Sequence, residues 1–305
     1  MKIGLVDLDT SHPANWIPVI RRMGHEVEAV WDGGTVFRSG YADRFAAEHG
    51  VPHVAGSLEE IADMVDCAII HSCDWDIHLS RAEIFQERGI PVLIDKPIAG
   101  RVGDLKRIGN WLEDGYRICG GSSLRFNYDV EEFLETPVSE RGEPCIVFAG
   151  CGIDEFSYGI HAYSLLCGIL GPGAKSVRYL GEKGQALIEI KWRDGRMGIV
   201  SVGKNEWIPF YATVVTDKGV KQIIVDSARL YESLLSPCLP YLSGETDEPP
   251  VPTASLMEPE LAAIAAMESR RRDGAWVSLD ELNEASFAYD GAVFADQYRK
   301  QRGDY

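Results

Sequence analysis

Lys96 is the residue whose place in the chain most directly suggests chemistry. It follows a predicted buried strand, 91–95, and precedes Pro97, which restricts the backbone around it. Ligands of open α/β sheets bind at the carboxyl ends of the strands, where a lysine can hydrogen-bond a substrate hydroxyl and stabilise a developing alkoxide. A solvated surface lysine is the alternative interpretation, so the sequence offers Lys96 as a candidate catalytic residue.

His161 is the matching candidate for proton transfer. It lies on a predicted helix, 156–169, and helical spacing puts Asp154 and Tyr158 on its face of the helix. Histidine titrates near neutral pH, which suits removal of a hydroxyl proton during hydride transfer. The alternative is a core histidine bonded to a backbone carbonyl. We therefore take His161 as a candidate acid–base group, with Asp154 and Tyr158 as its candidate neighbours in the site.

Asp32 ends the second predicted strand, about 20 residues past the first turn, where a dinucleotide-binding fold carries an acidic residue. An acid there accepts hydrogen bonds from ribose hydroxyls and repels a 2′-phosphate, which favours NAD over NADP. A simple turn aspartate is the alternative. Further nucleotide-facing candidates follow the predicted strand 66–71: Ser72, Asp74 and His78. The histidines and acids of this segment fit no usual metal spacing, so we expect no metal site.

The first turn of the chain lacks the glycines of a dinucleotide fingerprint. A short strand, 2–7, runs into a Ser-x-Pro helix start, and the glycine positions of G-x-G-x-x-G are Asp7, Asp9 and His12. A carboxylate about 4–5 Å from a phosphate charge repels it by about 1 kcal/mol in water, and by more in a drier site. Hydroxyls and helix amides remain as anion donors. Candidate cofactor contacts here are Leu8, Thr10, Ser11 and His12, while Asp7 and Asp9 leave binding itself open.

The elements that must position these residues fall into two groups. Strand and helix signals alternate through residues 1–121, which predicts βαβ units and a doubly wound parallel sheet. Residues 122–305 carry strands joined by tight turns, which predicts an α+β domain with a large, mostly antiparallel open sheet. We expect the proline-rich stretch 236–252 to be a loop, and 258–272 and 279–299 to be helices.

Composition excludes several classes of protein. A formal net charge of −17 disfavours nucleic acid and anionic membranes as partners. The chain has no run of about 18 apolar residues, so we expect no transmembrane helix, and its first residues do not resemble a signal peptide. The seven cysteines are scattered without C-x-x-C spacing, which favours reduced thiols and a cytoplasmic location.

Three segments together resemble the glucose–fructose oxidoreductase / inositol dehydrogenase (Gfo/Idh/MocA) family: 41–60, 88–99 and 157–161. The second is similar to the family's Glu-Lys-Pro segment, with Asp95 in place of the glutamate. The third is similar to its Asp-x-Gly-x-His helix. The resemblance covers nearly the whole chain. It implies a Rossmann domain followed by an open sheet that usually mediates homodimers or homotetramers.

The resemblance also implies roles for single residues. Members of this family mostly oxidise or reduce sugars, cyclitols and related polyols with NAD(P). By resemblance, Lys96 contacts both substrate and nicotinamide ribose, His161 is the acid–base group, and Arg125 lies in the segment that approaches substrate. The family's helix aspartate aligns with Ser157, so Asp154, one turn earlier, is the residue that could replace it.

Three functions remain open from the sequence. An NAD-dependent oxidoreductase acting on a sugar, cyclitol or related polyol is favoured by Lys96, His161 and Asp32. A protein that has lost dehydrogenation and binds a sugar-like ligand or a partner is favoured by Asp7, Asp9 and Ser157. A non-redox enzyme, such as a hydrolase or isomerase, could use the same pocket for proton transfer alone.

Overall fold

The first half of the chain forms a parallel sheet with helices on both sides. In the computed structural model, which describes residues 1–203 and 207–302, this sheet has six strands in the order β3-β2-β1-β4-β5-β6. All its pairs are parallel. The strands are β1 Lys2–Val6, β2 Glu26–Trp31, β3 His53–Val54, β4 Cys67–Ile70, β5 Val92–Asp95 and β6 Ile118–Gly121. The central strands are buried on both faces, as the continuous apolar runs predict.

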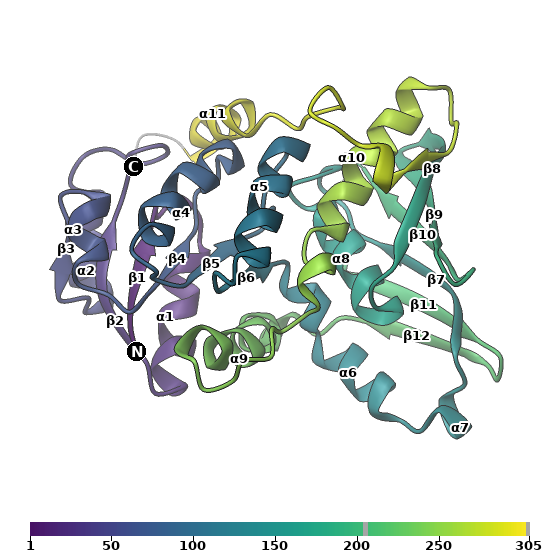
Figure 1. Ribbon diagram of the computed structural model, residues 1–305, viewed down its shortest axis with the longest axis horizontal. Coiled ribbons are helices and arrows are strands. Elements are labelled where there is room, and N and C mark those ends of the chain that lie inside the picture. The colour runs from purple at the N-terminus through teal and green to yellow at the C-terminus, as the bar shows by residue number, and fades with distance from the viewer. Residues whose placement is uncertain (204–206, 303–305) are drawn as a thin grey trace.

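Helices cover this sheet on each side (Figure 1). They are α1 His12–Arg22, α2 Tyr41–His49, α3 Leu58–Ala62, α4 His78–Gln86 and α5 Val102–Glu113, with the 3₁₀ turn η1 Trp75–Ile77 before α4. The strand order reverses between β1 and β4. In open α/β sheets the ligand crevice lies at such a point, outside the carboxyl ends of the strands.

The second half of the chain forms a seven-stranded sheet in the order β12-β11-β7-β10-β9-β8-β13. Only the β7–β10 pair is parallel, so the sheet is mostly antiparallel. The strands are β7 Pro144–Gly150, β8 Ala174–Lys183, β9 Gln185–Trp192, β10 Met197–Val202, β11 Tyr211–Thr216, β12 Val220–Ile224 and β13 Val277–Ser278. The structure thus confirms the predicted fold class: a Rossmann-like parallel sheet plus a second, mixed sheet.

One face of the second sheet is covered by α8 (Gly159–Leu170) and α10 (Glu258–Arg271). Its other face carries exposed apolar side chains, among them Phe148 and Leu187. Shorter elements link the two sheets: η2 Ser123–Phe126, α6 Tyr128–Glu135 and α7 Val138–Arg141. No helix in residues 1–203 and 207–302 is both long and apolar enough to cross a membrane.

Part of the proline-rich stretch that we expected to be a loop is helical. Helix α9 spans Leu230–Ser243 and contains Pro237 and Pro240. Each proline removes one backbone hydrogen bond. The helix nevertheless buries a set of apolar side chains against α1: Leu234, Leu235, Cys238, Leu239 and Leu242. Tertiary burial therefore outweighs the local signal, and the prediction of a loop was wrong for residues 236–243.

The last predicted helix is also displaced. The expected helix at 279–299 begins instead with a 3₁₀ turn, η5 Leu279–Glu281, and the regular helix α11 spans Gly291–Arg302. This helix returns to the first half of the molecule and contacts η1 (Figure 1). Both α9 and α11 therefore pack against the parallel sheet, although the sequence division at residue 121 would assign them to the second domain.

Candidate functional site

Lys96 and His161, two of the three catalytic candidates of the sequence, line one small pocket, and the third, Asp154, does not. The pocket has a volume of about 200 Å³ and is lined from β5, α1, α8 and α9. The side chains that could do chemistry there are His12, Asp95, Lys96, Tyr158 and His161. Apolar surface is supplied by Trp16, Trp207, Phe210, Leu230, Tyr231 and Leu234. Residues separated by up to 222 positions in the chain, His12 and Leu234, thus face a common space.

Lys96 follows β5 directly and reaches toward α8. Its Nζ donates to the carbonyl oxygen of Ser157 over 2.9 Å and lies 5.4 Å from the ring centroid of Tyr158. A cation above an aromatic face is favourable by about 0.5–2 kcal/mol. These contacts hold the ammonium at the edge of the pocket, where its two remaining protons are available to a ligand.

His161 lies deeper in the same pocket. Its Nδ1 is 2.7 Å from the hydroxyl of Ser122, which also accepts the amide of Leu124 over 3.1 Å. The pKa of His161 lies well below its usual value, chiefly because burial penalises the charged ring and secondly because the Lys96 charge is near. His161 is therefore neutral at physiological pH.

The Asp154 carboxylate hydrogen-bonds to the backbone just before α8. Its carboxylate accepts the amides of Phe156 (2.8 Å) and Tyr158 (3.0 Å) and the hydroxyl of Ser157 (2.7 Å). Among the described residues it makes no hydrogen bond to His161. Its predicted role as the partner of that histidine remains a prediction, and the geometry gives it the role of fixing where α8 begins.

The turn after β1 keeps a glycine-like conformation without a glycine. Asp7 has a φ of 60°, in the left-handed region that side chains rarely adopt. Its carboxylate compensates by accepting the amide of Gly33 over 2.8 Å and the hydroxyl of Ser72, and by pairing with Arg81 over 3.3 Å. The guanidinium of Arg81 also lies 4.5 Å from the ring of Trp31. Asp7 therefore ties together the ends of β1, β2 and β4.

Asp9 is buried just beyond this network. One of its oxygens accepts the amide of Cys73 over 2.9 Å, and the other has no hydrogen-bond partner within residues 1–203 and 207–302. Its pKa rises to about 7, first because of burial and then because of the charges of Asp7 and Asp32. Near neutral pH this carboxyl is therefore only partly ionised, so the turn carries less negative charge than its sequence suggests.

The other predicted cofactor residues divide into two groups. Thr10, Ser11 and Asp32 are not buried; the Thr10 hydroxyl accepts the His12 amide over 3.1 Å, and Asp32 accepts the Gly34 amide over 3.3 Å. Burial raises the pKa of Asp32. Four predicted residues are buried instead: Leu8, Ser72, Asp74 and His78. His78 bridges the carbonyls of Ser72 (2.8 Å) and Ile98 (3.0 Å), a structural arrangement that leaves it no free ring nitrogen.

Helix α11 lies across the carboxyl edge of the parallel sheet. Ala295 is buried against Val36, which follows β2, and Cys73, which follows β4. Phe294 packs 5.1 Å from Trp75, and the amide of Gly291 donates to Asp76 over 3.1 Å. The strands β2 and β4 flank β1, so α11 covers the crevice in which dinucleotides lie in this type of fold.

Arg125 is buried away from the pocket. Its guanidinium donates to the carbonyls of Ser255 (2.8 Å) and Leu256 (3.2 Å) and to the Ser255 hydroxyl (3.0 Å). It does not line the pocket of Lys96, so its predicted contact with substrate remains a prediction. The observed contacts join η2 to the segment before α10.

Two further residues at the site, Asp95 and Arg81, carry no functional signal in the sequence. Asp95 stood only as a substitution in the Lys-Pro segment, yet its carboxylate lies 2.5 Å from His12 Nδ1 and 3.2 Å from His71 Nδ1. The ligating atoms of these three residues lie within 4.8 Å of one another, which is also a candidate set of metal ligands. Arg81 carried no local signal. In each case the partners lie on different elements that are far apart in the chain, where sequence spacing gives no guidance.

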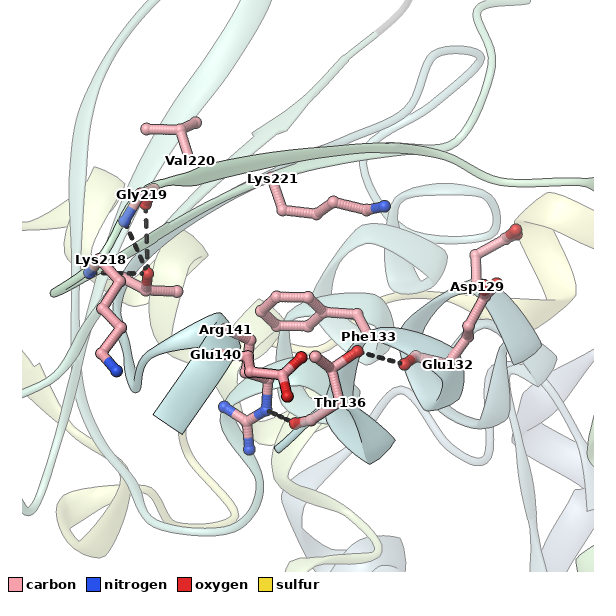
Figure 2. A pocket seen from close by; sticks show the side chains of 11 residues that line it. Asp129, Glu132, Phe133, Thr136, Glu140, Arg141, Lys218, Gly219, Val220 and Lys221 are labelled. Atoms are coloured by element: carbon pink, nitrogen blue, oxygen red, sulfur yellow. Dashed lines mark hydrogen bonds between the residues drawn. The ribbon is translucent and has the colours of Figure 1, made fainter. Parts of the chain in front are cut away.

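A second pocket, of about 300 Å³, lies between α6–α7 and the β11–β12 hairpin (Figure 2). Lys218 and Lys221 lie on the hairpin side, Arg141 lies beside Glu140 on α7, and the ring of Phe133 lies between Lys221 and Thr136. Arg141 Nε donates to the Thr136 carbonyl over 3.0 Å. Its charges are mixed and partly satisfied by the protein itself, so the Lys96 pocket is the better candidate site.

Comparisons with known proteins identify relatives by structure only. No family model and no curated protein matches the chain. A probable dehydrogenase from Thermotoga maritima superposes with a TM-score of 0.78 at 14% identity, covering 93% of this chain and 100% of that one. The chain shares the fold of that protein. A putative NADPH-dependent oxidoreductase from Desulfitobacterium hafniense has a TM-score of 0.78 at 13% identity and 92% and 98% coverage.

Myo-inositol dehydrogenase from Lactobacillus casei, solved in complex with NAD(H) and myo-inositol, has a TM-score of 0.74 at 16% identity and covers 94% and 98% of the two chains. At such low identity these likenesses establish the fold and leave substrate and cofactor to be argued from the site itself.

Proposed function

We propose that the protein is an oxidoreductase of the glucose–fructose oxidoreductase / inositol dehydrogenase type, acting on a sugar, cyclitol or related polyol with a nicotinamide cofactor. The observation that carries this proposal is the convergence of Lys96, His161 and the His12–Asp95 pair on one pocket at the carboxyl edge of the parallel sheet. Amine, imidazole and phenol groups suit a ligand rich in hydroxyls. The aromatic walls suit the apolar face of its ring.

The charges at the crevice are compatible with the diphosphate of a dinucleotide. Asp7 is paired with Arg81, and the pKa of about 7 leaves Asp9 partly protonated at neutral pH. The hydroxyls of Thr10 and Ser11 and the first amides of α1 would bind the diphosphate. Asp32 would bind the adenosine ribose and favour NAD over NADP. When bound, the nicotinamide would accept a hydride from the substrate carbon.

The space available for a dinucleotide limits its binding more than the charges do, because α11 covers this crevice. Cofactor binding therefore requires α11 to move away from Val36 and Cys73. In the pocket itself, Lys96 would hydrogen-bond the reacting hydroxyl and stabilise the alkoxide that forms when the hydroxyl proton leaves. A pocket imidazole would receive that proton.

Isothermal titration with NAD and NADH tests the proposal, followed by a thermal-shift panel of sugars and cyclitols that includes myo-inositol. We expect binding heat with NAD, and a polyol that raises the melting temperature further when NAD is present. Lys96→Ala should abolish turnover of that polyol, whereas Arg107→Ala, on the exposed side of α5, should not. Absence of heat at millimolar NAD and NADH would exclude the oxidoreductase.

A second candidate function is favoured by one observation, the cover that α11 forms over the crevice. A protein that binds a polyol in the Lys96 pocket without a dinucleotide would have the same fold and keep the crevice closed. This candidate predicts a polyol-dependent rise in melting temperature with no effect of NAD. The same two titrations therefore separate the two functions.

We also propose a homodimer or homotetramer that associates through the open face of the second sheet. Phe148, Leu180 and Leu187 are exposed on strands of this sheet, and contiguous exposed apolar surface of this kind marks interaction sites. A cytoplasmic location remains a prediction. It agrees with the seven free cysteines, six of which are buried.

A further inference from the structure

The carboxylate of Asp95 lies between two imidazoles at the base of the pocket. Its Oδ2 is 2.5 Å from His12 Nδ1 and 3.2 Å from His71 Nδ1, and its Oδ1 accepts the Lys96 amide over 2.7 Å. Asp95 and His71 are both buried. A buried carboxylate with three donors is rigidly oriented, so the two rings bonded to it are oriented as well.

Asp95 fixes which nitrogen of each ring carries the proton. Asp95 Oδ1 accepts the Lys96 amide, and Oδ2 lies within hydrogen-bonding distance of the Nδ1 atoms of both His12 and His71; a carboxylate oxygen that bridges two imidazole nitrogens accepts from both. The carboxylate is therefore ionised and can only accept. Each neutral imidazole must present N–H at Nδ1, which leaves the lone pair of His12 on Nε2.

His12 Nε2 is free to meet a ligand. The His12 side chain is 20% exposed and lines the pocket. Its ring stacks on Trp16, with centroids 5.7 Å apart, and meets Tyr231 edge-on at 5.3 Å. Among the described residues, no group hydrogen-bonds to Nε2. Aromatic walls and one carboxylate thus hold the ring while its basic nitrogen remains available.

His161 has the opposite polarity. The Ser122 hydroxyl accepts the Leu124 amide, and we assign its own proton to the hydrogen bond with His161 Nδ1. In this assignment Nε2 of His161 carries the proton and is a donor to the pocket. Because its pKa also lies well below the usual value, His161 is a poor acceptor of a second proton.

We propose that His12, with Asp95 as its positioning residue and His71 holding Asp95, is the group that takes the proton from the substrate hydroxyl. This inference rests on the proposed oxidoreductase function. The substrate O–H proton would pass to His12 Nε2 and the hydroxyl carbon would become a carbonyl; a bound nicotinamide cofactor would supply the acceptor for the C–H hydride. The imidazolium that forms is stabilised by Asp95, as in other Asp–His pairs. His161 then donates a hydrogen bond that orients the substrate.

Modification by diethyl pyrocarbonate, mapped by mass spectrometry, tests the pair without a substrate, because the reagent needs an unprotonated, accessible imidazole nitrogen. We expect His12 to be modified at least tenfold faster than His161 and His71. Asp95→Asn should slow modification of His12 at least tenfold, since the new amide can donate to Nδ1 and shift the ring proton to Nε2. Asp95→Glu should restore most of the rate. His53, whose side chain is 52% exposed, is the internal control and should react equally in every variant.

Three results would overturn the inference: faster modification of His161 than of His12, an unchanged His12 rate in Asp95→Asn, or stoichiometric metal in the purified protein that is lost in that variant. The last would make His12, His71 and Asp95 a metal site. If His12 reacts as expected while NAD gives no binding heat, the oxidoreductase proposal fails and the activated His12–Asp95 pair stands. If a polyol substrate is found, His12→Asn should remove the acidic limb of the pH–rate profile, whereas loss of a purely structural residue would lower the rate at all pH values.

Discussion

Replacement of Gly291 by alanine is a direct test of whether α11 controls access to the crevice. A Cβ at this position would lie 2.4 Å from Asp74 Oδ1 and 2.8 Å from the backbone nitrogens of Trp75 and Asp76. Ordinary contact begins near 3.4 Å, so the start of α11 must shift by about 1 Å. The shift also strains the Gly291–Asp76 hydrogen bond of 3.1 Å. Overpacking of this kind costs about 1–3 kcal/mol.

That cost applies only to the closed state, in which α11 packs over the crevice as in this structure, and not to an open state in which α11 has moved away. If the crevice binds NAD only after α11 leaves, the apparent dissociation constant is the intrinsic constant divided by the fraction of open molecules. A penalty of about 1–3 kcal/mol on the closed state therefore tightens NAD binding by about 5- to 150-fold, as long as the closed state still predominates. The assay is isothermal titration of wild type and Gly291→Ala with NAD, with hydrogen exchange of the α11 amides measured in parallel.

Val293→Ala is the matched control, because Val293 lies on the same helix with its side chain exposed. It should change neither NAD affinity nor exchange of α11. Faster exchange of α11 in Gly291→Ala with unchanged NAD affinity would refute the reasoning, since the helix would then have loosened without opening a cofactor site.

The remaining predictions concern stability and assembly. The raised pKa of Asp9 means that the folded state binds this proton more tightly than the unfolded state, so stability should fall as pH rises from about 4 to about 7, by at most about 4 kcal/mol. Urea unfolding at pH 5 and pH 8 measures this fall in stability, and Asp9→Asn should make the fall smaller. Glu260, whose pKa is also raised to about 7, accounts for the part that remains. An unchanged fall in Asp9→Asn would contradict the raised pKa of Asp9. Arg125→Gln should lower the unfolding free energy by about 3 kcal/mol without changing polyol affinity, and a weakened affinity would restore Arg125 to the substrate site. Phe148→Glu should dissociate the oligomer in light scattering, whereas Val138→Glu, on α7 outside the sheet, should not.

Local sequence signals predicted the parallel sheet well because its strands are continuous apolar runs separated by amphipathic helices. The same signals failed at α9, where two prolines argue for a loop and only the burial of its leucines against α1 makes a helix. They also failed after β13, where the chain runs through a 3₁₀ turn before α11 begins at Gly291. Both errors concern segments whose conformation is decided by distant contacts.

The site could be predicted only in part for the same reason. Lys96 and His161 could be identified because the evidence for each lies within one element: Lys96 directly follows a buried strand, and His161 lies on one helix. The Asp95 cluster could not, since His12, His71 and Asp95 belong to segments that adjoin β1, β4 and β5 and meet only through the strand order. In the sequence, Asp95 is a conservative replacement for the glutamate of the Glu-Lys-Pro segment. In the fold, its carboxylate is the acceptor that orients the rings of His12 and His71.

In the turn after β1, the number of acidic residues in the sequence overestimates the negative charge that a ligand would meet. Asp7 and Asp9 lie two residues apart, which suggests two repelling carboxylates beneath a diphosphate. In the fold, Arg81 from α4 neutralises Asp7, and the proximity of that same carboxylate helps to keep Asp9 partly protonated. The repulsion anticipated from the sequence is therefore largely removed before any ligand arrives. The packing of α11 on Val36 and Cys73 is then the steric barrier to the proposed dinucleotide, so affinity for NAD should respond far more to Gly291→Ala than to Asp9→Asn.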